Sequence, residues 1–264
     1  MHTLLIARLT RFTSFVALLG LGGVMYGCGS SDSGTPPNAN PTGYYSQGSL
    51  SVSDGTITDN NALQAMVYND RIIMMSAANN LLYDGTITSI NQSSFSAIFT
   101  IYSNGQNPST ASATGTITQG SSVTGTLSGT GLGNGTFSLT YALSNNNPAA
   151  IARIATEGKG VGWQGFNGSM SGFGYTILNS GSLFWEDDGG GFFSQCVMNG
   201  TFVPVSGVNV YTINVTVTGC QDSAINGTNY SGLAATRSQT STDDRLFFSV
   251  SNGSYSLYAE YQPF

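Results

Sequence analysis

Residues 211–218 read YTINVTVT, and this stretch decides the fold class. Its apolar residues fall on every second position from Tyr211, and Thr or Asn fills the positions between them. A period of two residues is typical of a β-strand with one buried face. Val, Ile and Thr are branched at Cβ and favour extended backbone over helix. The stretch therefore predicts a half-buried antiparallel strand, apolar inside and polar outside.

The same alternation recurs elsewhere, and its flanks repeat. NGTFSLTY at 134–141 is similar to NGSYSLYAEY at 252–261. Three turn-like triplets recur in order at offsets of 113 to 118 residues: Asp54–Gly55–Thr56, Asp84–Gly85–Thr86 and Asn134–Gly135–Thr136 return as Asn167–Gly168–Ser169, Asn199–Gly200–Thr201 and Asn252–Gly253–Ser254. Ordered repeats of this kind predict two copies of one unit of roughly 100 residues. Turn signals every 8–12 residues give about eight strands per unit. We expect an all-β fold with two tandem antiparallel β-barrel-like (calycin-like) modules, residues 44–147 and 148–264.

The N-terminal region indicates export. The apolar run LLGLGGVMYGC, Leu18–Cys28, follows Arg8 and Arg11 and is too short to span a bilayer as a finished helix. A cysteine directly after a small residue resembles the lipobox of bacterial lipoproteins, in which that cysteine is acylated. The resemblance implies a signal peptide at residues 1–27 and a lipid, palmitate included, on Cys28.

The segment after this cysteine predicts a tether. Residues 29–43, GSSDSGTPPNANPTG, are small, polar and punctuated by proline, so they cannot bury apolar surface. We therefore expect a flexible lipidated tether over residues 28–43. Gly29 is not the Asp that is associated with inner-membrane retention, which favours the bacterial outer membrane or cell surface as the location.

Composition excludes several functions. Only 8% of the chain is charged, and two of its seven basic residues precede Cys28 while all thirteen acidic residues follow it, so the mature part carries a formal charge of −8. This balance argues against nucleic acid and anionic lipid headgroups as partners, because binding to them rests on clustered Lys and Arg. The single histidine, His2, leaves with the signal peptide. Its loss removes histidine-based catalysis and most zinc sites, and we expect neither enzymatic activity nor a cofactor other than the lipid.

Two cysteines remain in the mature part. In an oxidising compartment we expect Cys196 and Cys220 to form a disulfide between neighbouring strands of the second module. Reductant should then destabilise the second module and leave the first unaffected.

One acidic segment is a candidate calcium site. Glu186, Asp187 and Asp188 could together supply oxygen ligands to Ca²⁺. The segment ends in Asp188–Gly189, a hairpin signal, so a simple turn is the competing and favoured interpretation.

Methionines and aromatic residues are the remaining candidates. Met74 and Met75 are adjacent in a predicted strand and point to opposite faces, so at least one of them packs in the core. Both tryptophans, Trp163 and Trp185, lie in the second module and are candidate ligand contacts. For Trp163, and likewise for Tyr230 and Tyr258, an exposed stacking platform and a core position both remain open.

Several landmarks together resemble a group of bacterial outer-membrane or surface lipoproteins with two tandem β-barrel-like modules. In the first copy they are ALQAMVYNDRIIMMSAANNLLYDGTI at 62–87; in the second they are CVMNGTFVPVSGVNVYTINVTVTGC at 196–220, NGTNYSGLAA at 226–235 and DDRLFFSV at 243–250. The resemblance covers about residues 45–261. It implies an extracytoplasmic two-module β architecture and the Cys196–Cys220 pair, and it transfers no catalytic residue.

Three function classes follow from these observations. The first is a non-enzymatic binding module held on the membrane by its lipid, with a protein, a glycan or a small apolar molecule as ligand. The second is a structural or envelope-assembly lipoprotein without a ligand, and the third and least favoured is an extracytoplasmic enzyme. An open apolar lumen would favour the first class, and a packed lumen with polar outer faces the second.

Overall fold

The computed structural model describes residues 36–146, 161–168, 173–177, 182–186, 195–237 and 245–263. Within these ranges the chain is all-β, with three 3₁₀ turns, η1 (Ala77–Asn79), η2 (Gly131–Gly133) and η3 (Ser223–Ile225), and no α-helix. None of the helical segments in these ranges is long and apolar enough to cross a membrane. The prediction of an all-β chain is confirmed.

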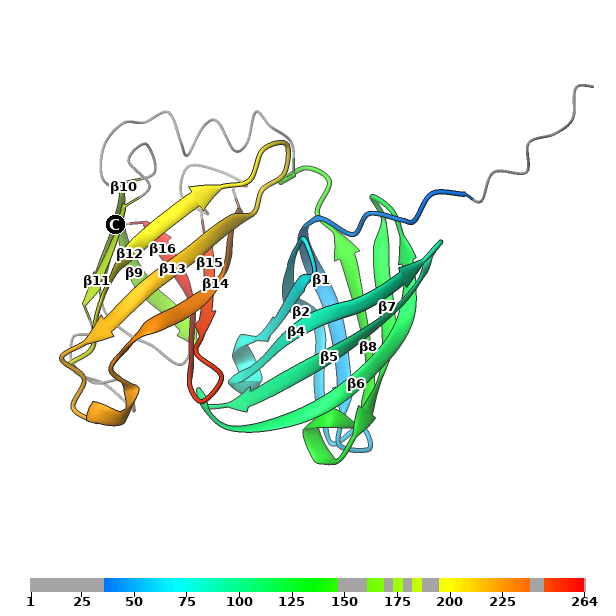
Figure 1. The fold of residues 1–264 in the computed structure, drawn as a ribbon, viewed down its shortest axis with the longest axis horizontal. Helices are drawn as coiled ribbons and strands as arrows, with labels where there is room; N and C mark the ends of the chain where they lie inside the picture. Colours follow the sequence, from blue (N-terminus) through cyan, green and yellow to red (C-terminus); the bar gives the residue numbers. More distant parts are fainter. Residues whose placement is uncertain are drawn as a thin grey trace, which may run out of the picture. The chain divides into compact units, whose positions relative to one another are not determined.

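The first module is a closed barrel of eight antiparallel strands (Figure 1). The strands are β1 (Gly43–Val52), β2 (Ile57–Tyr68), β3 (Arg71–Ser76), β4 (Leu81–Asn91), β5 (Ser94–Ser103), β6 (Gln106–Thr118), β7 (Ser122–Gly129) and β8 (Gly135–Tyr141). Each strand pairs with its sequence neighbours, and β8 closes the ring by pairing with β1 from Tyr45↔Tyr141 to Val52↔Gly135. Closure leaves no unpaired strand edge, so this barrel cannot recruit a further strand.

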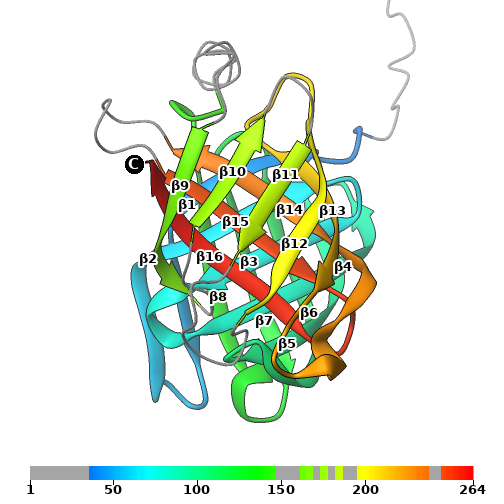
Figure 2. The same ribbon diagram turned by 90° about the vertical axis from the view of Figure 1, so that its left-hand side faces the viewer.

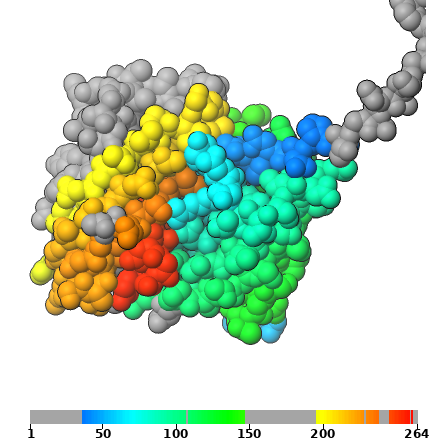
Figure 3. All heavy atoms as spheres, in the orientation of Figure 1, coloured from blue at the N-terminus to red at the C-terminus, as the bar shows by residue number. Residues whose placement is uncertain are grey.

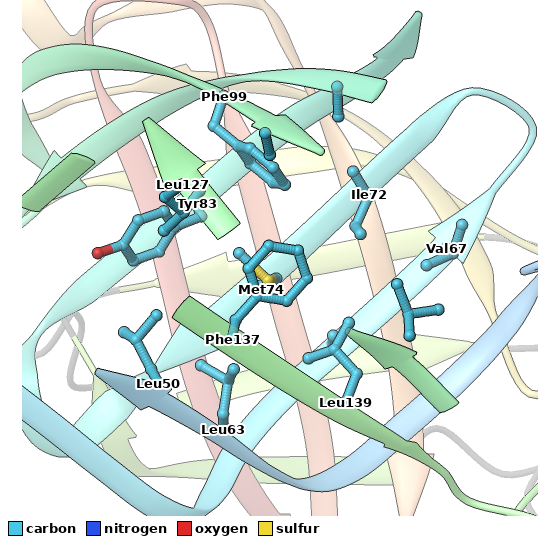
Figure 4. Close-up of a cluster of buried hydrophobic side chains, with 14 of the residues drawn as sticks. Leu50, Leu63, Val67, Ile72, Met74, Tyr83, Phe99, Leu127, Phe137 and Leu139 are labelled. Carbon is cyan, nitrogen blue, oxygen red and sulfur yellow. The ribbon is translucent and has the colours of Figure 1, made fainter. Parts of the chain in front are cut away.

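The lumen of the first barrel is filled by side chains. Alternate residues of all eight strands point inward and form one cluster of 22 buried hydrophobic residues. Figure 4 draws 14 buried side chains of such a cluster and labels ten of them, including Tyr83, Phe99 and Phe137. Phe99 and Phe137 meet edge to face with ring centroids 6.2 Å apart. An eight-stranded barrel is just wide enough for such a filling, and the core resides there.

The N-terminal segment of the described chain lies against one group of turns of this barrel. Asn38 accepts a hydrogen bond from the backbone N of Gln92 (2.8 Å), and the N of Ala39 donates to the Gln92 carbonyl (2.7 Å). The N of Asn40 donates to Gln119 Oε1 (2.9 Å), and Ala39 packs against the lumen cluster. Residues 38–42 are therefore held by the barrel, so the barrel unit begins before the predicted end of the tether at residue 43.

The second module is a sheet of eight further strands that also closes (Figure 2). They are β9 (Val161–Gly168), β10 (Phe173–Ile177), β11 (Ser182–Glu186), β12 (Val197–Pro204), β13 (Tyr211–Thr218), β14 (Gly227–Arg237), β15 (Arg245–Ser251) and β16 (Ser256–Pro263). The structure describes β9–β11 by their backbone alone, and β16 pairs with β9 to complete the ring. A second apolar cluster, with Phe202, Ile213 and Val250 among its members, fills the part lined by β12–β16.

Residues 211–218 form the half-buried strand that their alternating sequence predicted. In β13 the odd positions from Tyr211 to Val217 are buried and the even positions are exposed or half-exposed. The disulfide is confirmed: Cys196 directly precedes β12 and Cys220 follows β13, with an S–S distance of 2.01 Å. These strands are neighbours from Val197↔Thr218 to Pro204↔Tyr211.

Two of the six turn-like triplets lie wholly inside strands. Asp84–Gly85–Thr86 lies inside β4 and Asn199–Gly200–Thr201 inside β12, the fourth strand of each barrel. A Cβ on Gly85 would lie 2.4 Å from a Phe99 ring carbon, and one on Gly200 would lie 2.0 Å from the Asn214 carbonyl oxygen. At these positions glycine allows close packing inside the strand and does not reverse the chain.

Candidate functional site

Most predicted site residues of the N-terminal and acidic segments fall outside the described ranges. Cys28 and the start of the tether precede residue 36. Of the calcium candidates, Glu186 is the last residue of β11, while Asp187 and Asp188 lie outside the described residues. No group of three His, Cys, Asp or Glu side chains close enough to hold a metal ion occurs in the part of the chain that the structure describes.

The two tryptophan positions share one cross-strand row. Trp163 in β9 and Trp185 in β11 both pair with Gly174 in β10. Trp185 also pairs with Met198, which pairs with Val217, and both of these residues belong to the buried cluster of the second barrel. The structure describes both tryptophans by their backbone alone, so the expectation that they contact a ligand stays a prediction. Tyr230 and Tyr258 are buried, so both are core residues and neither is an exposed stacking platform.

A third apolar cluster joins the two barrels. It contains outward-facing residues of β1–β5, residues of β14–β16, and neighbouring positions: Tyr44, Met66, Ile73, Met75, Leu82, Tyr102 and Ala142 from the first barrel with Val210, Leu233, Ala235, Phe247 and Tyr258 from the second. We call this cluster and the polar groups around it the seam; Figure 3 shows the atoms of the two barrels meeting along it. Tyr44 stacks on Phe247 with ring centroids 5.6 Å apart.

An ion pair marks one end of the seam. Arg71 donates from Nε to Asp84 Oδ1 (2.9 Å) and from Nη2 to Asp84 Oδ2 (2.6 Å), a bidentate geometry. The same guanidinium reaches across to Ser231 in the second barrel, with Nη1 donating to its Oγ (3.0 Å) and Nη2 to its carbonyl (2.9 Å). Ser251 Oγ donates to Asp84 Oδ2 from the second barrel. Nearby, burial raises the pKa of Tyr102, and a hydrogen bond with Ser251 opposes that rise.

Backbone and amide groups cross the seam as well. The N of Ser256 in β16 donates to the Gly105 carbonyl in the β5–β6 turn (2.9 Å). Asn146, just after the first barrel, accepts from the N of Tyr44 (3.0 Å) and from the N of Asn209 in the second barrel (3.3 Å). These bonds pair buried polar groups of the first barrel with groups of the second.

The basic residues of the described chain all lie at the seam. Arg237 and Arg245 flank Glu260 at 3.7 and 3.4 Å, and the Arg237 guanidinium lies 5.5 Å from the centre of the Phe247 ring. With Arg71 they are the three basic residues within the described ranges. The remaining outer surface of those ranges therefore presents no cationic side chain that could bind an anionic polymer.

The outer face of β5–β8 is uncharged and rich in hydroxyl groups. Its exposed or half-exposed alternate positions are Ser94, Ser96, Thr100, Thr110, Ser112, Thr114, Thr116, Thr118, Ser122, Thr124, Thr126, Ser128, Thr136, Ser138 and Thr140, with Ile98 between them. They form rows in register, such as Ser96–Thr114–Thr126–Thr136. Among these side chains only Ser112 donates a hydrogen bond within the described protein, from Oγ to the Ser128 carbonyl (3.3 Å).

The packed carboxylates have structural partners. Asp59 accepts from Ser76 Oγ at 2.5 Å, Asp84 pairs with Arg71, and Glu260 lies between two arginines. Retaining and inverting hydrolases instead aim two carboxylates at one open site. No family model, curated protein or solved structure matches this chain. The site therefore has to be argued from the geometry alone.

Proposed function

We propose that the chain is a non-enzymatic lipoprotein, anchored through a lipid on Cys28 in the bacterial outer membrane, that acts through its outer surface in envelope structure or assembly. Both barrels are proposed to be calycin-like in architecture without using a lumen for ligand. The single observation that supports this function is the filled first lumen, where 22 buried hydrophobic residues occupy the space a small ligand would need.

A second candidate is recognition of a protein or a neutral glycan on the outer surface. The hydroxyl-rich face of β5–β8 favours it, because Ser and Thr hydroxyls both donate and accept hydrogen bonds and nearly all of these are free to do so. The absence of cationic side chains outside the seam in the described residues keeps nucleic acid out of the partner classes.

An apolar dye distinguishes action through the surface from binding in a lumen. We expect the purified mature chain to leave the fluorescence of N-phenyl-1-naphthylamine unchanged. Phe137→Ala opens a cavity in the first lumen, and dry apolar cavities of this kind bind small apolar molecules, so this variant should enhance the fluorescence. Leu139→Ala is a second, milder cavity variant in case the first fails to fold. Saturable one-to-one binding by the unmodified chain would contradict the proposal and restore the small-ligand hypothesis.

A further inference from the structure

The apolar outer face of the first barrel needs an occupant. On β2 and β3 consecutive residues are buried, as in Ala65–Val67 and Ile72–Met75, because one side chain enters the lumen and the next enters the seam. Exposed apolar patches of such extent on soluble proteins mark binding surfaces. The occupant on this face is the second barrel of the same chain.

We propose that this face is an obligate docking surface for the second barrel, and that the two barrels consequently unfold as one cooperative unit. The contact has the composition of a stable interface: an apolar centre, with polar groups at its ends that bond across it. At one end Arg71 joins Asp84 to Ser231, and at the other Asn146 joins Tyr44 to Asn209.

Arg71 is the positioning residue of this contact. Its guanidinium makes two bonds to Asp84 in its own barrel and two to Ser231 in the other, so its planar shape fixes how the barrels meet. Asp84 receives a further hydrogen bond from Ser251 of the second barrel. Both charged side chains are largely shielded, with 24% and 13% of their surface exposed, so solvent weakens the bonds less than at an open surface.

Coupling through the seam changes the expected effect of the disulfide. The bond lies in the second barrel, and the sequence alone predicted that reductant would destabilise that module by itself. If the second barrel covers the apolar face of the first, its loss of structure exposes Met66, Ile73 and Met75 to water. Reduction should then lower the stability of both barrels together.

The first experiment cuts the chain without disturbing its folding. A protease recognition sequence is inserted between Pro148 and Ala149, the Cys28→Ser form is folded as one chain, and the protease is then added. We expect the two fragments to co-elute as one particle at micromolar concentration and to separate in denaturant. Fragments that elute separately in native buffer would refute obligate docking.

Arg71→Met is the matched variant for this experiment. It should weaken the association of the cut fragments by about tenfold or more, since it removes charge-assisted bonds on both sides of the seam. Asp70→Asn changes the exposed neighbouring residue and should leave the association unchanged. Equal association for both variants would show that Arg71 does not position the barrels.

Hydrogen exchange tests the cooperativity with the uncut chain. With the disulfide intact, peptides from β6–β8 and from β13–β15 should lose protection at the same denaturant concentration. Reductant should shift both transitions equally. A first barrel that keeps its protection while the second loses it would overturn the inference.

Discussion

Substituting two adjacent methionines one at a time gives the sharpest test of strands buried on both faces. Met74 lies in the lumen of the first barrel and Met75 in the seam, with exposed fractions of 0% and 1%. Truncating a fully buried Met to Ala costs about 2–5 kcal/mol, the loss of transfer free energy plus that of the cavity left behind. We therefore expect Met74→Ala and Met75→Ala each to lower the free energy of unfolding by about this amount.

Chemical denaturation followed by far-ultraviolet circular dichroism measures the free energy of unfolding of each variant, and thermal denaturation measures its Tm. For a folded unit of this size 1 kcal/mol corresponds to roughly 2–4 °C in Tm, so either variant should melt several degrees below the parent chain. Ile98→Ala is the control, because that side chain is 56% exposed and its loss should change stability by less than about 0.5 kcal/mol. If Met75→Ala resembles Ile98→Ala while Met74→Ala is costly, the seam does not form in solution and the reasoning is refuted.

Four further measurements follow from the sequence and the structure. Cys28→Ser should abolish incorporation of radiolabelled palmitate and release the mature protein from membranes; continued labelling and sedimentation would contradict the lipid anchor. Ser249 has a buried hydroxyl without a hydrogen-bond partner, so Ser249→Ala should keep or raise the free energy of unfolding, by up to about 1–3 kcal/mol, in a urea titration. As ligand contacts, Trp163 and Trp185 should have emission that acrylamide quenches in the free protein, whereas blue-shifted emission shielded from acrylamide would place both rings in the core and contradict their role in recognition. Burial raises the pKa of Tyr44 above its usual value near 10, so the unfolded chain loses the phenolic proton at a lower pH than the folded chain does. The stability that this group contributes is fully present below about pH 10 and is lost as pH rises further. Absorbance at 295 nm would detect the ionisation, and denaturation at pH 8 and 11 would detect the loss of stability.

The sequence predicted the features that depend on local pattern. Alternation from Tyr211 to Thr218 predicted an antiparallel strand, and repeated landmarks predicted a closed sheet of about eight strands, as the first barrel shows. Cysteine counting predicted the disulfide. Each of these depends on neighbours in sequence or on the chemistry of one residue type.

The seam could not be predicted from periodicity, because alternation assumes that one face of a strand meets water. Where the second barrel covers that face, apolar residues run without interruption, as in Ile72–Met75. Such a run was visible in the sequence, but a strand buried on both faces and a simple core segment look alike. The Asp84–Gly85–Thr86 triplet was misassigned for a similar reason: the glycine accommodates the Phe99 ring, a contact between strands that spacing along one strand does not reveal.

The seam joins different faces of two similar barrels: β1–β5 of the first meet β14–β16 of the second, the counterparts of β6–β8. An interface between unlike surfaces is not closed by two-fold symmetry, so in principle each barrel could add another and build a filament. Polar side chains on the outer faces of the two barrels disfavour such repeated addition. The outer face of β6–β8, which a preceding barrel would have to contact, carries Ser and Thr, and the described outer face of β12–β13, which a following barrel would have to contact, carries Asn199, Thr201 and Asn214 beside the exposed Val203. We therefore expect these hydroxyl and amide groups to act as polar caps that disfavour the addition of a third barrel.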